Sequence, residues 1–227
     1  MSFGLLVKNN TNYIQIDSDT PRLCALYSGS YQAVGNQVAV VNFPSPVTTS
    51  EPPCIFIRNT ESRPDDLYMM MTINGGPGNW TGFSIEAANV TWRPQGKWFV
   101  AVFASRSSAT WGLRMWAANG AIIYDSGATP IIVTKATNSW SFQGTVQLTI
   151  GNAYYYRAEV VGSLASDEYF MINPFSRGIL APSRPQGNQS GVRFNYAENR
   201  LQLYSVGTTG WSDNGSPGAV FARLPGT

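Results

Sequence analysis

The chain has 227 residues, a formal net charge of +2 and only 12% charged residues. Its Lys and Arg residues are scattered, so they do not form the basic stripe that phosphate contacts require, and no nucleic-acid partner is expected. The hydrophobic fraction of 43% is sufficient for a buried core and argues against a disordered chain.

The absence of histidine excludes several kinds of site. With no His in the sequence, Ser-His-Asp and Cys-His triads and His-based zinc sites cannot form. We therefore predict no catalytic residue and no metal site. The opening "MSFGLLVKNN" lacks the apolar core of a signal peptide, and runs such as "WFVAVFA" are shorter than the ~20 residues of a membrane helix. The sequence predicts synthesis in the cytoplasm and no membrane insertion.

The hydrophobic pattern is that of β-strands along the whole chain. Apolar residues alternate with polar ones or form short runs between Gly, Pro, Asn and Ser, and no segment has sustained helical periodicity. We predict an all-β fold of antiparallel β-sandwich domains with recurring β-hairpin modules. The expected strands are 4–8, 12–17, 23–27, 37–43, 53–58, 67–73, 82–87, 97–104, 111–116, 121–125, 130–134, 143–150, 154–161, 168–172, 191–196, 200–206 and 219–223.

One pattern occurs three times. The stretches "GLLVKNNTNYIQIDS" and "GLRMWAANGAIIYDS" have the same spacing of apolar residues and both end in Asp-Ser, and "GVRFNYAENRLQLYS" repeats the spacing but ends in Tyr-Ser. Each consists of two alternating segments around a turn-forming tetrapeptide. We predict β-hairpins at 4–18, 112–126 and 191–205.

The Asp of the Asp-Ser pair has two interpretations. Asp17 and Asp125 could accept backbone hydrogen bonds at a strand end, as in an Asx-turn. A catalytic Asp-Ser is the alternative, which we disfavour because no base is nearby in the sequence. The repeat therefore predicts architecture and not chemistry.

A central strand is expected around Trp98. Trp98, Val100 and Val102 alternate with Phe99, Ala101 and Phe103. Both faces of this strand are apolar, which predicts a strand covered on both sides or one at a subunit interface.

The order of several weak motifs resembles a known family. Phe43-Pro44 is followed by Pro52-Pro53 at the start of a strand, then by Gly82-Phe83, then by Trp98 before a final strand. Over residues 1–134 this order resembles the receptor-binding β-sandwich at the tips of bacteriophage tail fibres, which is similar to H-type lectin domains. The first hairpin also resembles the start of small tail-tip proteins of siphophages and prophages.

The resemblance implies a non-enzymatic virion protein of a phage tail tip or fibre that has no cofactor and contributes to assembly and host attachment. It implies a homo-oligomer, with a trimer favoured, that contacts other tail or baseplate proteins and a glycan or protein of the host surface. Residues 1–134 would form an N-terminal sandwich, and residues 135–227 a smaller C-terminal β domain. A lectin-like carbohydrate-binding module is the alternative, and a polysaccharide depolymerase is a third, less favoured one.

Three aromatic residues are candidates for receptor or glycan binding. Trp80, Tyr196 and Trp211 are flanked by Asn, Asp, Ser or Thr, which can hydrogen-bond sugar hydroxyls while the ring stacks on the sugar. Each could instead plug the end of a sandwich or lie at a subunit interface.

Other reactive residues have structural interpretations that we favour. Cys24 and Cys54 are predicted to be buried thiols, with a disulfide as the alternative. The adjacent carboxylates Asp65-Asp66 and Asp167-Glu168 could serve a glycosidase or a Ca²⁺ site, but solvated loops are favoured.

Overall fold

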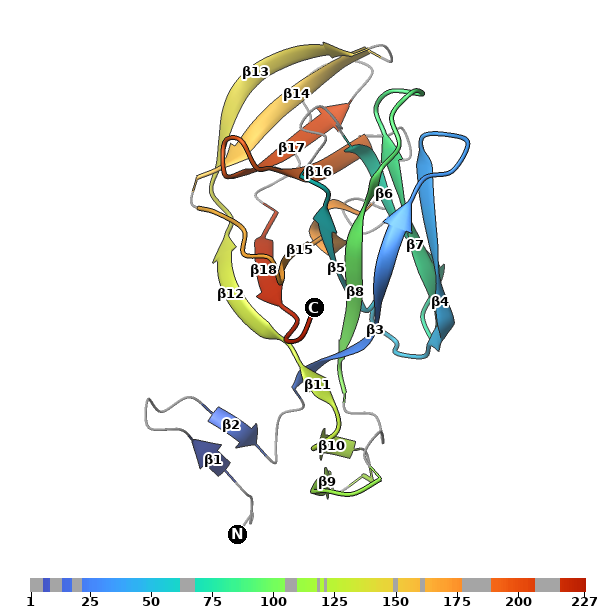
Figure 1. Cartoon of the computed structure of the whole chain (residues 1–227), viewed down its shortest axis with the longest axis vertical. Coiled ribbons are helices and arrows are strands. Elements are labelled where there is room, and N and C mark those ends of the chain that lie inside the picture. Colours follow the sequence, from blue (N-terminus) through green and yellow to red (C-terminus); the bar gives the residue numbers. More distant parts are fainter. Residues whose placement is uncertain are drawn as a thin grey trace.

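The structure, a computed structural model, consists almost entirely of antiparallel β-strands (Figure 1). It describes residues 6–8, 14–17, 22–61, 68–104, 110–117, 119–120, 122–148, 151–159, 162–176, 189–206 and 217–227. Each predicted strand overlaps an observed one, and the predicted all-β class is confirmed. A short 3-10 helix, η1 (Asn173–Phe175), follows one strand.

The main sheet has seven strands and curls until its two edges meet. Its order is β11 (Thr129–Pro130), β3 (Leu23–Gln32), β8 (Gln95–Phe103), β5 (Cys54–Asn59), β15 (Glu168–Met171), β18 (Ala219–Arg223) and β12 (Ile132–Thr137). The edge strands β11 and β12 are consecutive in the chain. At Ile131, whose N–H donates to the Leu23 carbonyl over 3.0 Å, the chain leaves β3 and begins to pair with β18.

Two smaller sheets lie side by side against this main sheet. One is β4 (Val38–Val47), β7 (Asn79–Ala87) and β6 (Tyr68–Gly76). The other is β13 (Trp140–Leu148), β14 (Gly151–Ala158), β17 (Arg200–Val206) and β16 (Gln189–Asn195). Strand β16 approaches β6 so closely that a Cβ on Gly191 would lie 1.6 Å from the Tyr68 carbonyl oxygen. Glycine is therefore required there because the two backbones are in contact.

The main sheet is apolar on both faces, as the alternation around Trp98 predicts. Trp98, Val100 and Val102 belong to the large core between the main sheet and the two smaller sheets. Phe99 and Ala101 point to the opposite face, into a second core that the curled sheet encloses. Phe56 and Tyr169 belong to the same core. The Phe56 and Phe99 rings are stacked, with centroids 4.7 Å apart. From Trp98 to Val102, strand β8 is thus covered on both sides, whereas Phe103 at its end is 65% exposed.

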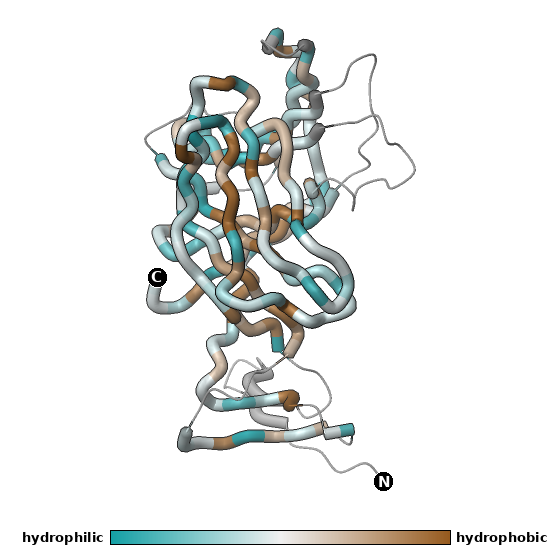
Figure 2. The backbone as a smooth tube through the Cα atoms, turned by 90° about the vertical axis from the view of Figure 1, so that its right-hand side faces the viewer, coloured by the Kyte–Doolittle hydropathy of each residue, from teal (hydrophilic) through white to brown (hydrophobic). Residues whose placement is uncertain are grey.

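The three repeated stretches all contain antiparallel strand pairs. β1 (Leu6–Lys8) pairs with β2 (Ile14–Asp17), β9 (Arg114–Trp116) pairs with β10 (Ile122–Asp125), and β16 pairs with β17. The first two pairs remain separate two-stranded sheets at one end of the molecule (Figures 1 and 2). The Asx-turn is confirmed at Asp125, whose Oδ1 accepts the Gly127 N–H over 2.8 Å.

Strands from both predicted segments belong to the main sheet, where β5 of the first segment pairs with β15 of the second. Its members β3, β5 and β8 precede residue 135, whereas β15 and β18 follow it. The predicted boundary between residues 134 and 135 falls inside β12. The two segments therefore share a sheet and a core.

Cys24 and Cys54 are free thiols, as predicted, with Cys24 buried and Cys54 half-buried. They flank β8 on either side, where Cys24 is opposite Val102 and Cys54 is opposite Ala101. Because consecutive strand residues point to opposite faces, the two thiols lie on different faces of the sheet. Burial raises the pKa of the Cys54 thiol.

Candidate functional site

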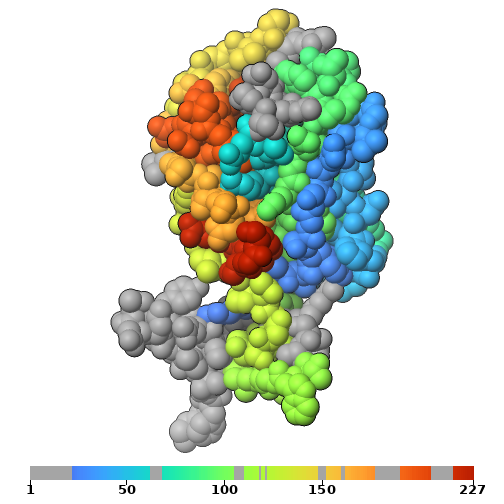
Figure 3. All heavy atoms as spheres, in the orientation of Figure 1, coloured from blue at the N-terminus to red at the C-terminus, as the bar shows by residue number. Residues whose placement is uncertain are grey.

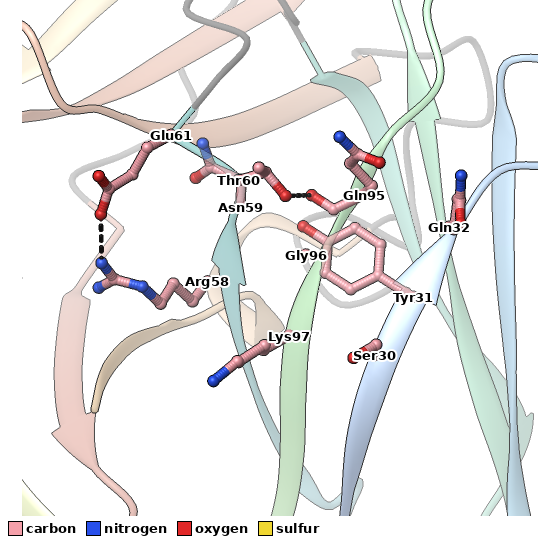
Figure 4. A pocket seen from close by; sticks show the side chains of 10 residues that line it. All are labelled: Ser30, Tyr31, Gln32, Arg58, Asn59, Thr60, Glu61, Gln95, Gly96 and Lys97. Carbon is pink, nitrogen blue, oxygen red and sulfur yellow. Dashed lines mark hydrogen bonds and ion pairs between the residues drawn. The ribbon is translucent and has the colours of Figure 1, made fainter. Parts of the chain in front are cut away.

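A hollow of about 650 Å³ lies where β3 and β5 end and β8 begins (Figure 4). Most of its lining residues are polar or charged. They are Ser30, Tyr31, Gln32, Arg58, Asn59, Thr60, Glu61, Gln95, Gly96 and Lys97. Three strands that are distant in sequence therefore contribute hydrogen-bonding groups to one open site.

Strand register determines which side chains share a face of the hollow. Ser30 of β3 and Arg58 of β5 are both opposite Lys97 of β8. Two residues along the same strands, Phe56 and Phe99 form the next pair on that face. Alternate residues of a strand share a face. Ser30, Arg58 and Lys97 therefore lie on the same face of the main sheet as Phe56 and Phe99 of the enclosed aromatic core.

Gly96 makes the close packing beneath the hollow possible. A Cβ at this position would lie 2.1 Å from the Arg58 carbonyl oxygen and 2.7 Å from the Tyr31 hydroxyl. The Tyr31 ring occupies that space, and its hydroxyl lies 3.3 Å from the Tyr68 hydroxyl. A larger residue at position 96 would displace this ring from the core.

Arg58 is held by two contacts outside the hollow and by one with Glu61 of its lining. Its Nη1 donates to the Ala165 carbonyl over 2.5 Å, and its guanidinium lies over the Tyr196 ring, 5.3 Å from the centroid. Its Nη2 forms an ion pair with Glu61 over 2.7 Å, although the Glu61 side chain is 65% exposed. Arg58 therefore presents a fixed cation whose carboxylate partner is mostly in solvent.

Four other lining side chains have unused hydrogen-bonding capacity. Within the described ranges, the side chains of Ser30, Gln32, Gln95 and Lys97 have no hydrogen-bond or ion-pair partner. Asn59, by contrast, is engaged in the fold: its side-chain amide donates to the Phe194 carbonyl over 3.0 Å and accepts the Phe194 N–H over 2.9 Å. The hollow thus contains Asn59, which is bonded to the backbone of the fold, and four side chains that can still donate or accept hydrogen bonds.

The three aromatic candidates from the sequence do not come together. Trp80 is buried at the opposite end of the sandwich, paired with Val47, and its Nε1 donates to the Thr49 carbonyl over 2.9 Å.

Tyr196 is half-buried beside the hollow, where its hydroxyl donates to the Asn59 carbonyl over 2.6 Å. Burial raises the pKa of Tyr196 to about 12. Trp211 lies outside the described residues.

The adjacent carboxylates are used in packing where the structure describes them. Glu168 is buried and accepts hydrogen bonds from the Thr134 hydroxyl and the Ala165 N–H, and it pairs with Lys135 over 3.2 Å.

Asp167, the neighbour of Glu168, forms an ion pair with Arg223 over 3.5 Å. Asp65 and Asp66 lie outside the described residues. Elsewhere in the described part of the chain, no group of three His, Cys, Asp or Glu residues could hold a metal ion.

A second surface feature lies on the β9–β10 hairpin. Trp111 is 90% exposed, Trp116 58% and Leu113 47%. The hairpin that carries them is held by an ion pair of 2.7 Å between Arg114 and the buried Asp125 carboxylate. Figure 3 shows this part of the chain projecting from one end of the body. These three exposed side chains are called the hairpin surface below.

Sequence reasoning missed the hollow. Its residues come from three separate strands, and each is an ordinary polar position in an alternating pattern. The Arg in "IFIRN" and the Lys in "GKWF" give no signal until the register of β5 and β8 is known, because only that register makes them neighbours.

The chain has no match among family models, curated proteins or solved structures. Across the described ranges, no helix has the length and apolar character needed to cross a membrane.

Proposed function

We propose that the chain is a non-enzymatic structural component of a bacteriophage tail tip or tail fibre that forms a homo-oligomer and contributes to host attachment. The observation that supports this is that two surfaces lie beyond opposite ends of strand β8. The hollow lies where Gln32 pairs with Gln95, and the hairpin surface follows the other end of β8, where Leu23 pairs with Phe103. One end is suited to recognition and the other to assembly.

The hairpin surface supports the assembly role. A two-stranded sheet is at most marginally stable alone in water, and large exposed aromatic side chains on a soluble protein indicate an interface. The Arg114–Asp125 pair neutralises the local charge, so copies of the surface can meet without like-charge repulsion. We propose that copies of this chain meet here, with a trimer expected.

The hollow supports the attachment role. Its available hydroxyl, amide and ammonium groups are the kinds that bind a polar surface molecule of the host. A lectin-like module that acts as a free monomer is the second candidate function, and the same hydrogen-bonding groups of Ser30, Gln32 and Gln95 favour it.

Light scattering coupled to size exclusion, together with co-purification with virions, tests the proposal. We expect the wild-type chain to be an oligomer. The double variant Trp111→Ser/Trp116→Ser should be a monomer, and its circular dichroism spectrum should be unchanged. Phe142→Ser is the matched control, because Phe142 is 53% exposed on a different sheet. A wild-type monomer that binds defined glycans and is absent from virions would favour the lectin-like module.

A further inference from the structure

We propose that the hollow binds an anionic group between Arg58 and Lys97, and that its ligand is a saccharide carrying a carboxylate or phosphate substituent. This inference rests on the proposed function, because it specifies the class of host-surface molecule that the hollow would contact.

The first argument is the placement of two cations. Arg58 and Lys97 are directly opposite each other in the β5–β8 ladder. Figure 4 shows their side chains extending to the same side of the sheet. Like charges at directly opposite positions destabilise a pair of strands. An anion bound between them would convert this repulsion into two attractive contacts.

The second argument is the incomplete neutralisation of these cations. Glu61 pairs with Arg58, whose side chain is 12% exposed, but the Glu61 side chain is itself 65% exposed, so solvent screens its attraction to the guanidinium. Lys97 has no partner among the described residues. A ligand carboxylate or phosphate can therefore displace Glu61 at little cost and reach Lys97 as well.

The third argument is that Arg58 is already oriented. The Ala165 carbonyl and the Tyr196 ring hold its guanidinium without help from the hollow. A cation that is fixed before binding loses little conformational entropy when an anion arrives. Charge-assisted hydrogen bonds from such a group are stronger than neutral ones.

The groups next to the cations indicate a saccharide. Gln32 and Gln95 are opposite each other on β3 and β8, and Ser30 is opposite Lys97. Their amides and hydroxyl can both donate and accept hydrogen bonds, as sugar hydroxyls do. A simple inorganic anion would leave these groups unused.

Isothermal titration calorimetry of the full chain tests the inference with three probes: hexagalacturonate, a glycerol phosphate oligomer and neutral maltohexaose. We expect at least one anionic probe to bind more tightly than maltohexaose, and its affinity to fall as sodium chloride is raised. Lys97→Gln should weaken that probe about tenfold, the scale of a lost charged hydrogen bond. Gln32→Ala should weaken every probe that binds.

Arg22→Gln is the matched control. It removes the same charge at the far end of β3, about 25 Å from Ser30 at ~3.3 Å per residue, and should leave affinity unchanged. Equal losses in Lys97→Gln and Arg22→Gln would show nonspecific charge attraction and overturn the inference. Equal binding of neutral and anionic probes, with no effect of Lys97→Gln, would also overturn it.

Adhesion to host cells separates this inference from the proposed function. If none of the probes binds but the wild-type chain still adheres to cells, the anionic saccharide is wrong and the attachment role stands. If the chain neither binds a probe nor adheres, both are overturned.

Discussion

Two copies of one sequence pattern end in opposite environments. In the copy at 191–205, β16 and β17 join a four-stranded sheet, and the side chains of Val192 and Leu201 are fully buried. In the copy at 112–126, β9 and β10 pair with each other alone, and the aligned Leu113 is 47% exposed. The same local alternation thus produces a hairpin in both places. Burial depends on what the rest of the chain brings against it.

The difference in burial predicts a large difference in stability. Phe194→Ala should lower the free energy of unfolding by about 3–5 kcal/mol, because it opens a cavity in a core from which water is excluded. Leu113→Ala should change it by less than ~0.5 kcal/mol when it is made in the Trp111→Ser/Trp116→Ser background, in which no second copy covers the hairpin. Chemical denaturation measures both. Similar losses in the two variants would contradict the contrast between the copies.

The local stability of the β9–β10 hairpin should instead depend on the ion pair between Arg114 and Asp125. Asp125→Asn removes the charge that pairs with Arg114 but keeps an oxygen that can accept the Gly127 N–H. We expect β9–β10 to loosen by about 1–3 kcal/mol, the cost of a lost hydrogen bond to a charged group. Hydrogen exchange of backbone amides should accelerate in β9–β10 and stay unchanged in β16–β17. Faster exchange in both would mean that the hairpin is coupled to the core.

The smallest effect concerns the pH dependence of stability that Glu168, at the start of β15 in the main sheet, confers. Burial disfavours the Glu168 carboxylate, but hydrogen bonds from Thr134 and the Ala165 N–H, with the charge of Lys135, lower its pKa below the usual 4.5. A lowered pKa means that the carboxylate stabilises the fold above about pH 4.5, and that this stability is lost as pH falls through the lower folded value.

Glu168→Gln should therefore destabilise the protein at neutral pH and reduce the loss of stability between neutral and acidic pH. Thermal unfolding across this range measures the effect, with the exposed Glu51→Gln as control. An acid profile of Glu168→Gln that runs parallel to the wild type would show that other groups cause the acid sensitivity. The β9–β10 hairpin does not contain the Glu168 carboxylate. Hydrogen exchange in this hairpin should therefore change in Asp125→Asn and stay unchanged in Glu168→Gln.

The strands and hairpins were predictable because their signals are local. Alternation, turn residues and the two apolar faces around Trp98 are read within a few residues, and the Asx-turn of Asp125 involves a backbone group two residues away. The hollow could not be predicted. Arg58 and Lys97 meet only because β5 pairs with β8 in one register, and an offset of one residue would point one of them to the opposite face.

By itself, then, the sequence determined the all-β class, the strand positions and three hairpins. Long-range packing, by contrast, makes the chain change partners at Ile131, so that the main sheet curls around an aromatic core. It also decided that Trp80 is buried while Trp111 is exposed. The physical reason is that local backbone preferences act over a few residues, whereas burial and site assembly depend on contacts between distant strands.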